Sequence, residues 1–133
     1  MFTYQIQSRE KFYPTYNEWC EAHGFPTIPS SWLPEKVFIA YKDDIPTHSC
    51  FFWETDSALA LIGFPCSNKL ADKEVKEGGL EYLYAVMCEY AKSKHYQSIS
   101  TYSHSERPTI LSALKANNFV IGDVDVINLI KHL

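Results

Sequence analysis

A pair of glycines, Gly78-Gly79, stands where the longest amphipathic pattern of the chain begins. Glycine is a poor helix former, so a pair at a helix start indicates that something approaches the backbone closely there. The residues just before the pair, 73–77, are mostly charged, and they equally fit a tight helix entry preceded by a solvated loop. Both interpretations of the glycine pair stay open.

The cysteines and histidines show no pattern of a metal or disulfide site. Four cysteines lie at wide spacings with no C-x-x-C motif, which predicts reduced and mostly buried thiols of a cytosolic protein. The five histidines have no metal-ligand spacing. The adjacent Ser103-His104 does not indicate a catalytic triad, because nothing in the sequence identifies a carboxylate that would orient the histidine.

Length and composition predict one compact domain over residues 1–133. The chain is 46% hydrophobic and 21% charged, as in an ordinary globular protein. Its 12 basic and 16 acidic residues give a net charge of −4, which makes nucleic acid an unlikely partner. We expect a cytoplasmic protein without membrane attachment, since no long apolar run or signal-peptide core is present.

The first part of the chain predicts a strand and a helix. Residues 2–7 alternate large and polar side chains, so their large members should share one buried face. A helix is predicted within residues 8–23, with Ser8 as its N-cap, Pro14 in its first turn and Gly24 at its end. The three prolines of residues 24–34 predict an ordered but irregular connection.

The rest of the chain alternates strand and helix signals. A hairpin and a central strand covered on both faces are predicted at residues 37–41, 46–53 and 58–64. Gly63 and Pro65 favour a bulge or a splay at the end of that central strand. Further on, the patterns predict a long helix within residues 68–94, a strand at 99–102, a helix at 108–117, and two last strands at 119–121 and 126–130.

This order of elements predicts a mixed α/β (α+β) fold, and it resembles the GNAT superfamily of acyl-coenzyme A dependent N-acyltransferases. The resemblance rests on a central strand, a glycine turn into a long helix, a short strand and a last helix, at residues 59–64, 74–79, 80–92, 99–102 and 108–119. Shorter matches, among them His23-Gly24-Phe25-Pro26 and Lys76-x-x-Gly79-Leu80, look like small GNAT-like proteins of phage genomes. The resemblance implies a mixed central sheet with an antiparallel first half, splayed central strands and about three helices.

The resemblance implies acetyl-coenzyme A as the cofactor. In the superfamily, a glycine motif lets the pyrophosphate approach the N–H groups at a helix N-terminus. Here Glu74 and Glu77 replace the motif's first polar or basic residue and its middle glycine, and would repel phosphates. The candidate cofactor-binding residues are Phe64, Cys66 and Ser67 on the splayed strand, with Lys73, Lys76, Gly78 and Gly79 at the helix start. Alternatively, Pro65 simply ends the strand.

Acyl transfer to an amine needs a group that accepts a proton and a group that protonates the leaving thiolate. By the resemblance, Glu54 is the candidate base, although an exposed turn residue would look the same. The tyrosine acid of many family members falls on Leu114 here, so the acid would come from Tyr102, Ser103 or His104.

The sequence therefore predicts a small acetyltransferase, encoded by a phage, that acts on an unidentified amine of a small molecule or a protein. Its departures from the family pattern favour an alternative, a catalytically degenerate binding protein or virion-associated structural protein. The expected location is the host cytoplasm or, for the alternative, the virion. A free edge in the last predicted hairpin would permit a homodimer.

Overall fold

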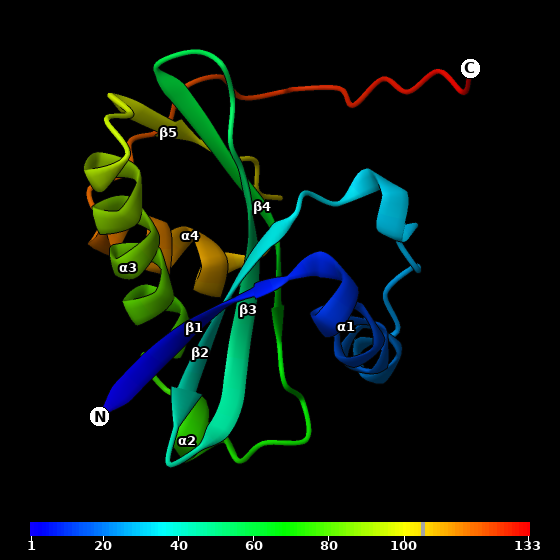
Figure 1. The fold of residues 1–133 in the computed structure, drawn as a ribbon, viewed down its shortest axis with the longest axis vertical. Coiled ribbons are helices and arrows are strands. Elements are labelled where there is room, and N and C mark those ends of the chain that lie inside the picture. Colours follow the sequence, from blue (N-terminus) through cyan, green and yellow to red (C-terminus); the bar gives the residue numbers. More distant parts are fainter. Residues whose placement is uncertain (105) are drawn as a thin grey trace.

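A computed structural model of the chain describes residues 1–104 and 106–133. One five-stranded sheet runs through the molecule in the order β1-β2-β3-β4-β5 (Figure 1). Its strands are β1 (Phe2–Ser8), β2 (Lys36–Lys42), β3 (Ile45–Trp53), β4 (Leu59–Ser67) and β5 (Ser98–Ser100). The first four strands pair antiparallel, and β5 pairs parallel to β4. The predicted mixed α/β sheet with an antiparallel first half is confirmed.

Helices cover both faces of the sheet. The helix α1 lies on one face, and α3 and α4 lie on the other (Figure 1). The described helices are α1 (Arg9–His23), the single-turn α2 (Lys73–Lys76), α3 (Gly79–Ser93) and α4 (Pro108–Ala116), with a short 3-10 turn at Ser30–Trp32. In the described part of the chain, no helix is both long and apolar enough to span a membrane.

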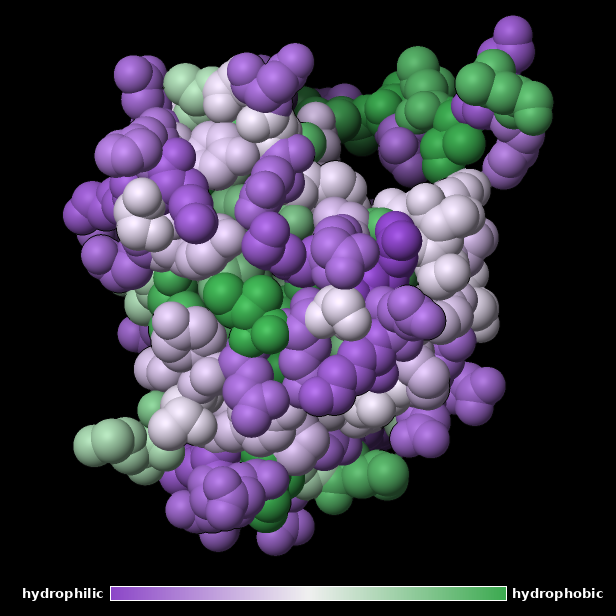
Figure 2. All heavy atoms as spheres, in the orientation of Figure 1, coloured by the Kyte–Doolittle hydropathy of each residue, from purple (hydrophilic) through white to green (hydrophobic). Residues whose placement is uncertain are grey.

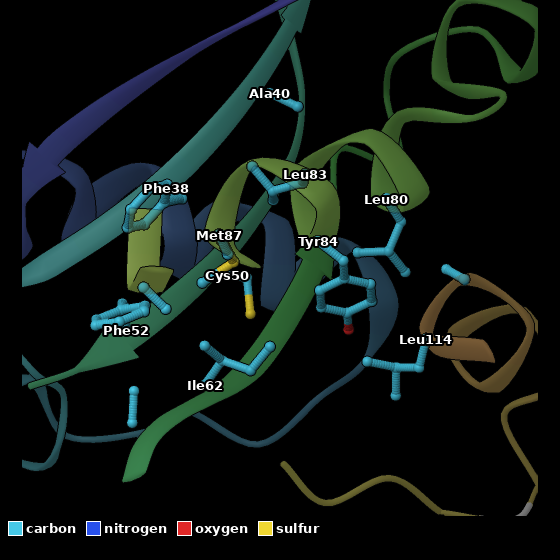
Figure 3. Packing of buried hydrophobic residues seen from close by; sticks show 13 residues of the cluster. Phe38, Ala40, Cys50, Phe52, Ile62, Leu80, Leu83, Tyr84, Met87 and Leu114 are labelled. Atoms are coloured by element: carbon cyan, nitrogen blue, oxygen red, sulfur yellow. The ribbon is translucent and has the colours of Figure 1, made fainter. Parts of the chain in front are cut away.

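A cluster of buried side chains joins α3 and α4 to the sheet (Figure 3). Phe38 on β2 and Phe52 on β3 lie edge-on to Tyr90 of α3, with ring centroids 5.1 and 5.3 Å away. The predicted apolar stripe of α3 forms the other side of this cluster, where Leu80, Leu83, Tyr84, Met87 and Ala91 are buried. The periodicity therefore identified the buried face of this helix correctly.

A second cluster lies under α1. Its helix residues, Phe12, Tyr16, Trp19 and Cys20, pack on Val37, Ile39, Phe51 and Cys66 of the sheet. The predicted cap is confirmed, because the Ser8 side chain accepts a hydrogen bond from the Lys11 N–H and Gly24 ends the helix at φ 73°. Pro14 is not in the first turn as predicted but in the second, one turn after the capped end. Proline has no backbone N–H, so the helix loses a single hydrogen bond there. The packing of α1 on the sheet compensates for this loss.

Three predictions about strands are wrong. The large residues of β1 do not share a buried face: Tyr4 is 46% exposed because β1 is the edge strand and no helix covers it fully. Nor is β4 covered on both faces, since Leu59 and Leu61 are 40% and 37% exposed. The two last strands, predicted at residues 119–121 and 126–130, are absent, and this segment is extended chain without a strand partner.

Candidate functional site

The strand β4 carries a bulge where the sequence predicts a distortion. Ser49 pairs with Cys66 and Phe51 with Gly63, so one residue of β3 faces two of β4. The two residues are Phe64 and Pro65, and Phe64 adopts a φ of 50°, which is rare for a side chain of this size. The predicted bulge at Gly63 and Pro65 is confirmed.

The strand β4 loses its neighbour β5 after Leu61. The strand β5 pairs only with Leu59, Ala60 and Leu61, while β4 continues to Ser67. The outer edge of residues 62–67 therefore has no β5 strand beside it, which is the predicted splay of the two strands. Backbone N–H and C=O groups along such an edge need partners from a ligand or from water.

A cavity of about 400 Å³ opens at this splay. It is lined by His23, Phe25, His48, Pro65, Cys66, Ser67, Leu80, Arg107, Thr109 and Ile110. His23 and Phe25 come from the side of the sheet that α1 covers, whereas Leu80 and Ile110 come from α3 and α4 on the opposite side. We call it the through-sheet cavity, because residues from both faces line one space at the gap between β4 and β5.

Arg107 gives the through-sheet cavity a positive end. Among the described lining residues it is the one with a permanent charge, and its guanidinium lies 4.5 Å from the centre of the Phe25 ring. It stands at the N-cap of α4, where the helix dipole is already positive and disfavours a cation. The first turn of α3 also lines the cavity, through Leu80. The arrangement suits an anion at this end of the cavity.

His48, on β3, lines the same cavity. Burial, and secondarily the charge of Lys76, lowers the pKa of His48 to about 4. Its Nδ1 lies 3.1 Å from the Thr47 hydroxyl, which itself donates to the Ala40 carbonyl. The hydroxyl hydrogen is thus committed, so His48 Nδ1–H is the donor and Nε2 keeps its lone pair. At neutral pH His48 is an uncharged hydrogen-bonding group.

His23 lies on the α1 side of the cavity. Its Nε2 is 2.9 Å from the Ser67 carbonyl oxygen and 3.0 Å from the Ser67 hydroxyl. A carbonyl oxygen can only accept, so Nε2 carries the hydrogen and Nδ1 keeps a lone pair. The ring also stacks on Phe25 at 4.9 Å, which fixes its orientation. This arrangement leaves one imidazole nitrogen able to accept a proton.

The predicted cofactor residues divide into two groups. Cys66 and Ser67 line the through-sheet cavity, and Phe64 stands at the bulge beside Trp53, with ring centroids 5.9 Å apart. Burial, followed by the neighbouring Cys20, raises the pKa of the Cys66 thiol to about 12, so this thiol is protonated and is not a nucleophile at neutral pH. The lysines Lys73 and Lys76 lie on α2, outside the lining.

Gly78 and Gly79 are each required to be glycine, but for different structural reasons. Gly78 is exposed and needs its positive φ of 81° to start α3. Gly79 is buried, and a Cβ built on it would overlap the His48 ring and lie 3.1 Å from the Thr47 hydroxyl oxygen. The close approach that the glycine pair predicts exists, and the group that approaches Gly79 is a histidine of the same chain.

Glu54 lies away from the through-sheet cavity. It follows β3, six residues beyond His48, which is about 20 Å along an extended strand. Its carboxylate pairs with Lys36 Nζ at 2.6 Å and accepts a hydrogen bond from the Tyr90 hydroxyl at 3.2 Å. The hydrogen bond from Lys36 lowers the pKa of Glu54. It borders a smaller cavity of about 190 Å³, with Trp53 and Phe52.

The predicted acids stand in the connection between β5 and α4. Tyr102 is 79% exposed, and the Ser103 hydroxyl donates to the His104 carbonyl at 3.3 Å. None of the three belongs to the lining of the through-sheet cavity in the described part of the chain. The same part holds no cluster of three or more His, Cys, Asp or Glu side chains that could bind a metal ion.

Sequence reasoning missed His23, His48 and Arg107 as a group. They are far apart in the chain, and only the folded sheet brings them to one cavity. One local signal exists for Arg107, because it directly precedes the helix-starting Pro108 and a cation is unfavourable at that end of a helix. Nothing local marks the two histidines.

No protein-family model matches the chain, and no curated protein matches it significantly by sequence. Solved structures do match. An aminoglycoside acetyltransferase from an uncultured soil metagenomic sample, in complex with sisomicin, has a TM-score of 0.68 at 13% identity over 99% of this chain and 96% of its own. An acetyltransferase of Trypanosoma brucei has a TM-score of 0.66 at 8% identity, covering 98% of this chain and 100% of its own.

The aminoglycoside N-acetyltransferase AAC(6')-Iy in complex with CoA is similar to the same extent. Its TM-score is 0.66 at 13% identity, over 100% of this chain and 97% of its own. These likenesses span nearly the whole length of both partners. At such low identity they establish the fold that the chain shares with these acetyltransferases.

The contact between Gly79 and His48 makes a prediction about stability. Gly79→Ala should lower the free energy of unfolding by about 1–3 kcal/mol, the usual cost of overpacking a full site. In a His48→Ala background the same change should cost much less, because the overlapping ring is gone. Urea denaturation of the four proteins measures this cycle.

Gly122→Ala is the matched control, since nothing lies within 4 Å of a Cβ there, and it should leave stability unchanged. If Gly79→Ala lowers the free energy of unfolding equally with His48 present and in the His48→Ala background, the His48 ring is not what excludes a side chain at this position.

The depressed pKa of His48 predicts a pH dependence of stability. Between pH 6.5 and about 4 the unfolded chain binds a proton at this imidazole that the folded chain does not bind. The free energy of unfolding should therefore fall by roughly 3 kcal/mol as the pH drops through this window, at 1.36 kcal/mol for each unit of pKa difference. Chemical denaturation at a series of pH values measures it.

His48→Gln should flatten this dependence, whereas His104→Gln, at an exposed loop position, should leave it as it is. A slope that persists in His48→Gln would assign the effect to another group.

Proposed function

We propose that this chain, whose fold is that of the GNAT acetyltransferases, binds acetyl-coenzyme A in the through-sheet cavity and transfers its acetyl group to an amine. The observation that carries the proposal is the unpaired edge of β4 beyond Leu61, together with the cavity of about 400 Å³ beside it. A cavity that passes through a sheet lets an acyl donor enter from one face while an acceptor approaches from the other.

The residues at the cavity fit the chemistry of such a donor. The free edge of residues 62–67 offers backbone groups that can pair with the amides of a pantetheine arm, as an added strand would. Leu80 and Ile110 supply apolar contact for the arm. Arg107 and the first N–H groups of α4 offer charge and donors to phosphates. When bound, coenzyme A would supply a thioester whose carbonyl carbon can be attacked by an amine nitrogen.

The phosphates would be held differently from the pattern of the superfamily. The His48 ring fills the space next to Gly79 where a Cβ would stand. Glu74 and Glu77 lie just before α3. We therefore assign the anionic end to Arg107, with Lys76 as a second cation near enough to affect His48. Bidentate donation from a guanidinium suits a phosphate, and its contact with Phe25 holds it in place.

His23 is the better candidate base. It lies at the cavity, its ring is held by Ser67 and Phe25, and its Nδ1 lone pair is free to accept the proton that an attacking amine releases. Glu54, the base expected by resemblance, is engaged by Lys36 and is remote from the cavity. The proton that the leaving thiolate needs would come from the same imidazole or from solvent.

The acceptor is an amine of a class that the cavity does not specify. The phage origin expected from the sequence stays a prediction. A second candidate function, a binding protein that keeps the fold without turnover, is favoured by Leu114: it is buried in the core at the position of the family's tyrosine acid. The two functions differ in turnover, so one pair of measurements separates them.

Acetyl-coenzyme A should bind the purified protein saturably, and Arg107→Gln should weaken this binding at least tenfold because it removes the cation from the cavity. Isothermal titration measures both values. Lys115→Gln is the matched control: it removes the same charge from the exposed last turn of α4, and the affinity should stay within twofold. Absence of binding at millimolar acetyl-coenzyme A, with the protein folded, would contradict the proposal.

Turnover should depend on His23 and be independent of Glu54. Release of free thiol from acetyl-coenzyme A, followed over a panel of amines, should fall at least a hundredfold in His23→Gln, while titration gives an unchanged affinity for the cofactor. Glu54→Gln should release thiol at the same rate as the unchanged protein. Binding without thiol release for any amine would favour the binding protein, and a rate lost in Glu54→Gln alone would return the role of base to that carboxylate.

A further inference from the structure

Four apolar side chains of β3 and β4 form an exposed surface at one end of the sheet. Leu59, Leu61 and Phe64 are 40%, 37% and 39% exposed. Trp53 is half-buried and pairs with Leu61 across the two strands. Apolar side chains on inner strands of a sheet are normally covered, so an exposed group of them indicates a binding surface. We call these four side chains the aromatic shelf.

The aromatic shelf faces the same side of the sheet as α1. Ala60 and Ile62 alternate with its two leucines along β4 and are buried under α3 and α4, so the leucines point to the opposite side. Among the described residues of β4, only Cys66 belongs to the cluster under α1. The helix therefore covers the far end of the strand and leaves the shelf open.

The shelf differs from the other exposed apolar side chains of the protein. Residues 120–133 carry most of the apolar side chains that are more than half exposed, and Figure 2 shows them as a green group that projects from the protein. They belong to no described helix or strand. The backbone of the shelf, in contrast, is fixed in the sheet, and a fixed surface can orient a ligand.

The strained residue Phe64 holds its ring on the shelf. A Cβ built on Gly63 would lie 3.3 Å from the Trp53 ring, and the Phe64 ring centroid lies 5.9 Å from that of the same tryptophan. Consecutive residues of a regular strand point to opposite faces, but Gly63 and Phe64 both face Trp53. The positive φ of Phe64, 50°, allows this. Glycine or asparagine would adopt this φ at lower cost, so the chain keeps an exposed phenylalanine here although it lowers stability, which is a mark of functional sites.

The shelf continues into the through-sheet cavity. Pro65 and Cys66, which directly follow Phe64, line that cavity. The next residue, Ser67, holds the ring of His23. Three residues of a strand span about 10 Å, so about that length of strand separates the shelf from the residue that holds the candidate base.

The cavity offers no anion to a second ammonium group of an acceptor. None of its described lining residues is acidic, and Arg107 is a cation. The carboxylate next to the shelf, that of Glu54, is paired with Lys36. Coulomb repulsion therefore disfavours an acceptor with several ammonium groups, and the shelf favours an acceptor that carries an apolar group.

We propose that the acceptor is a primary amine whose short carbon chain ends in a flat apolar ring, and that the ring lies on the aromatic shelf while the nitrogen reaches His23. This inference rests on the proposed function, because this nitrogen is the one that would accept the acetyl group. A ring followed by two to four carbons and a nitrogen spans about 7–9 Å, close to the separation along the strand. Rings pack edge-on or offset on aromatic side chains, which the tilted pair of Trp53 and Phe64 permits. An amine and a thioester give an amide and a thiol, so the reaction needs no further reactant.

Binding to the shelf can be measured without turnover, with coenzyme A present, which has no acetyl group to transfer. Titrated 2-phenylethylamine should shift the NMR signal of the Trp53 indole N–H, because an aromatic ring changes the magnetic field at its neighbours. Trp19, which is 4% exposed under α1, is the internal control, and its signal should stay in place. n-Butylamine, which has the same amino group without a ring, should shift neither signal. An unchanged Trp53 signal at millimolar 2-phenylethylamine would overturn the inference.

The shelf also predicts a preference in turnover. The kcat/KM for thiol release from acetyl-coenzyme A should be at least tenfold higher with 2-phenylethylamine than with n-butylamine, because covering the ring removes about 100 Å² of apolar surface from water. It should be lower still with 1,4-diaminobutane, which brings a second ammonium group toward Arg107. Equal values for the three amines would overturn the inference and leave acetyl transfer standing. Binding at Trp53 without thiol release from any amine would instead contradict the proposed function, and the acceptor role with it.

Phe64→Asn tests the strained residue. The variant should fold, because asparagine adopts a positive φ more readily than phenylalanine, and the ratio of kcat/KM between 2-phenylethylamine and n-butylamine should fall to about 2 or less. Leu61→Thr, a second variant that keeps a strand-forming residue on β4, should lower the same ratio. Tyr4→Asn is the matched control: it removes an aromatic side chain that is 46% exposed on β1, at the other edge of the sheet, and the ratio should stay within twofold. A ratio that is unchanged in both Phe64→Asn and Leu61→Thr would show that the ring does not lie on the shelf.

Discussion

The loss of pairing between β4 and β5 beyond Leu61 is the feature on which the rest of the site depends. A strand that continues for six residues with no β5 beside its outer edge leaves backbone donors and acceptors on that edge, which water or a ligand must satisfy. The bulge at Phe64 lies in this stretch, and its positive φ costs of order 1 kcal/mol or more, which the surrounding packing must offset. The strain lies next to the cavity, because Pro65 and Cys66, which directly follow Phe64, line it.

The electrostatic design of the cavity follows from the same separation. With β5 ended at Ser100, the chain returns to the sheet through α4, and this brings Arg107 and the positive end of the helix to the gap. Two features of like sign are stable together only if an anion or solvent offsets them. His48 adds no charge, because burial keeps it neutral. The polar groups that the cavity offers to a ligand are therefore one cation, Arg107, and backbone donors.

Local features of this fold could be predicted from the sequence, and features that depend on distant segments could not. The cap at Ser8, the stripe of α3 and the bulge at Gly63 and Pro65 rest on near neighbours in the chain, and the structure contains all three. His23, His48 and Arg107 meet only after the sheet has formed. The strands predicted at 119–121 and 126–130 failed for a related reason: strand composition is local, but a strand exists only where an edge accepts it.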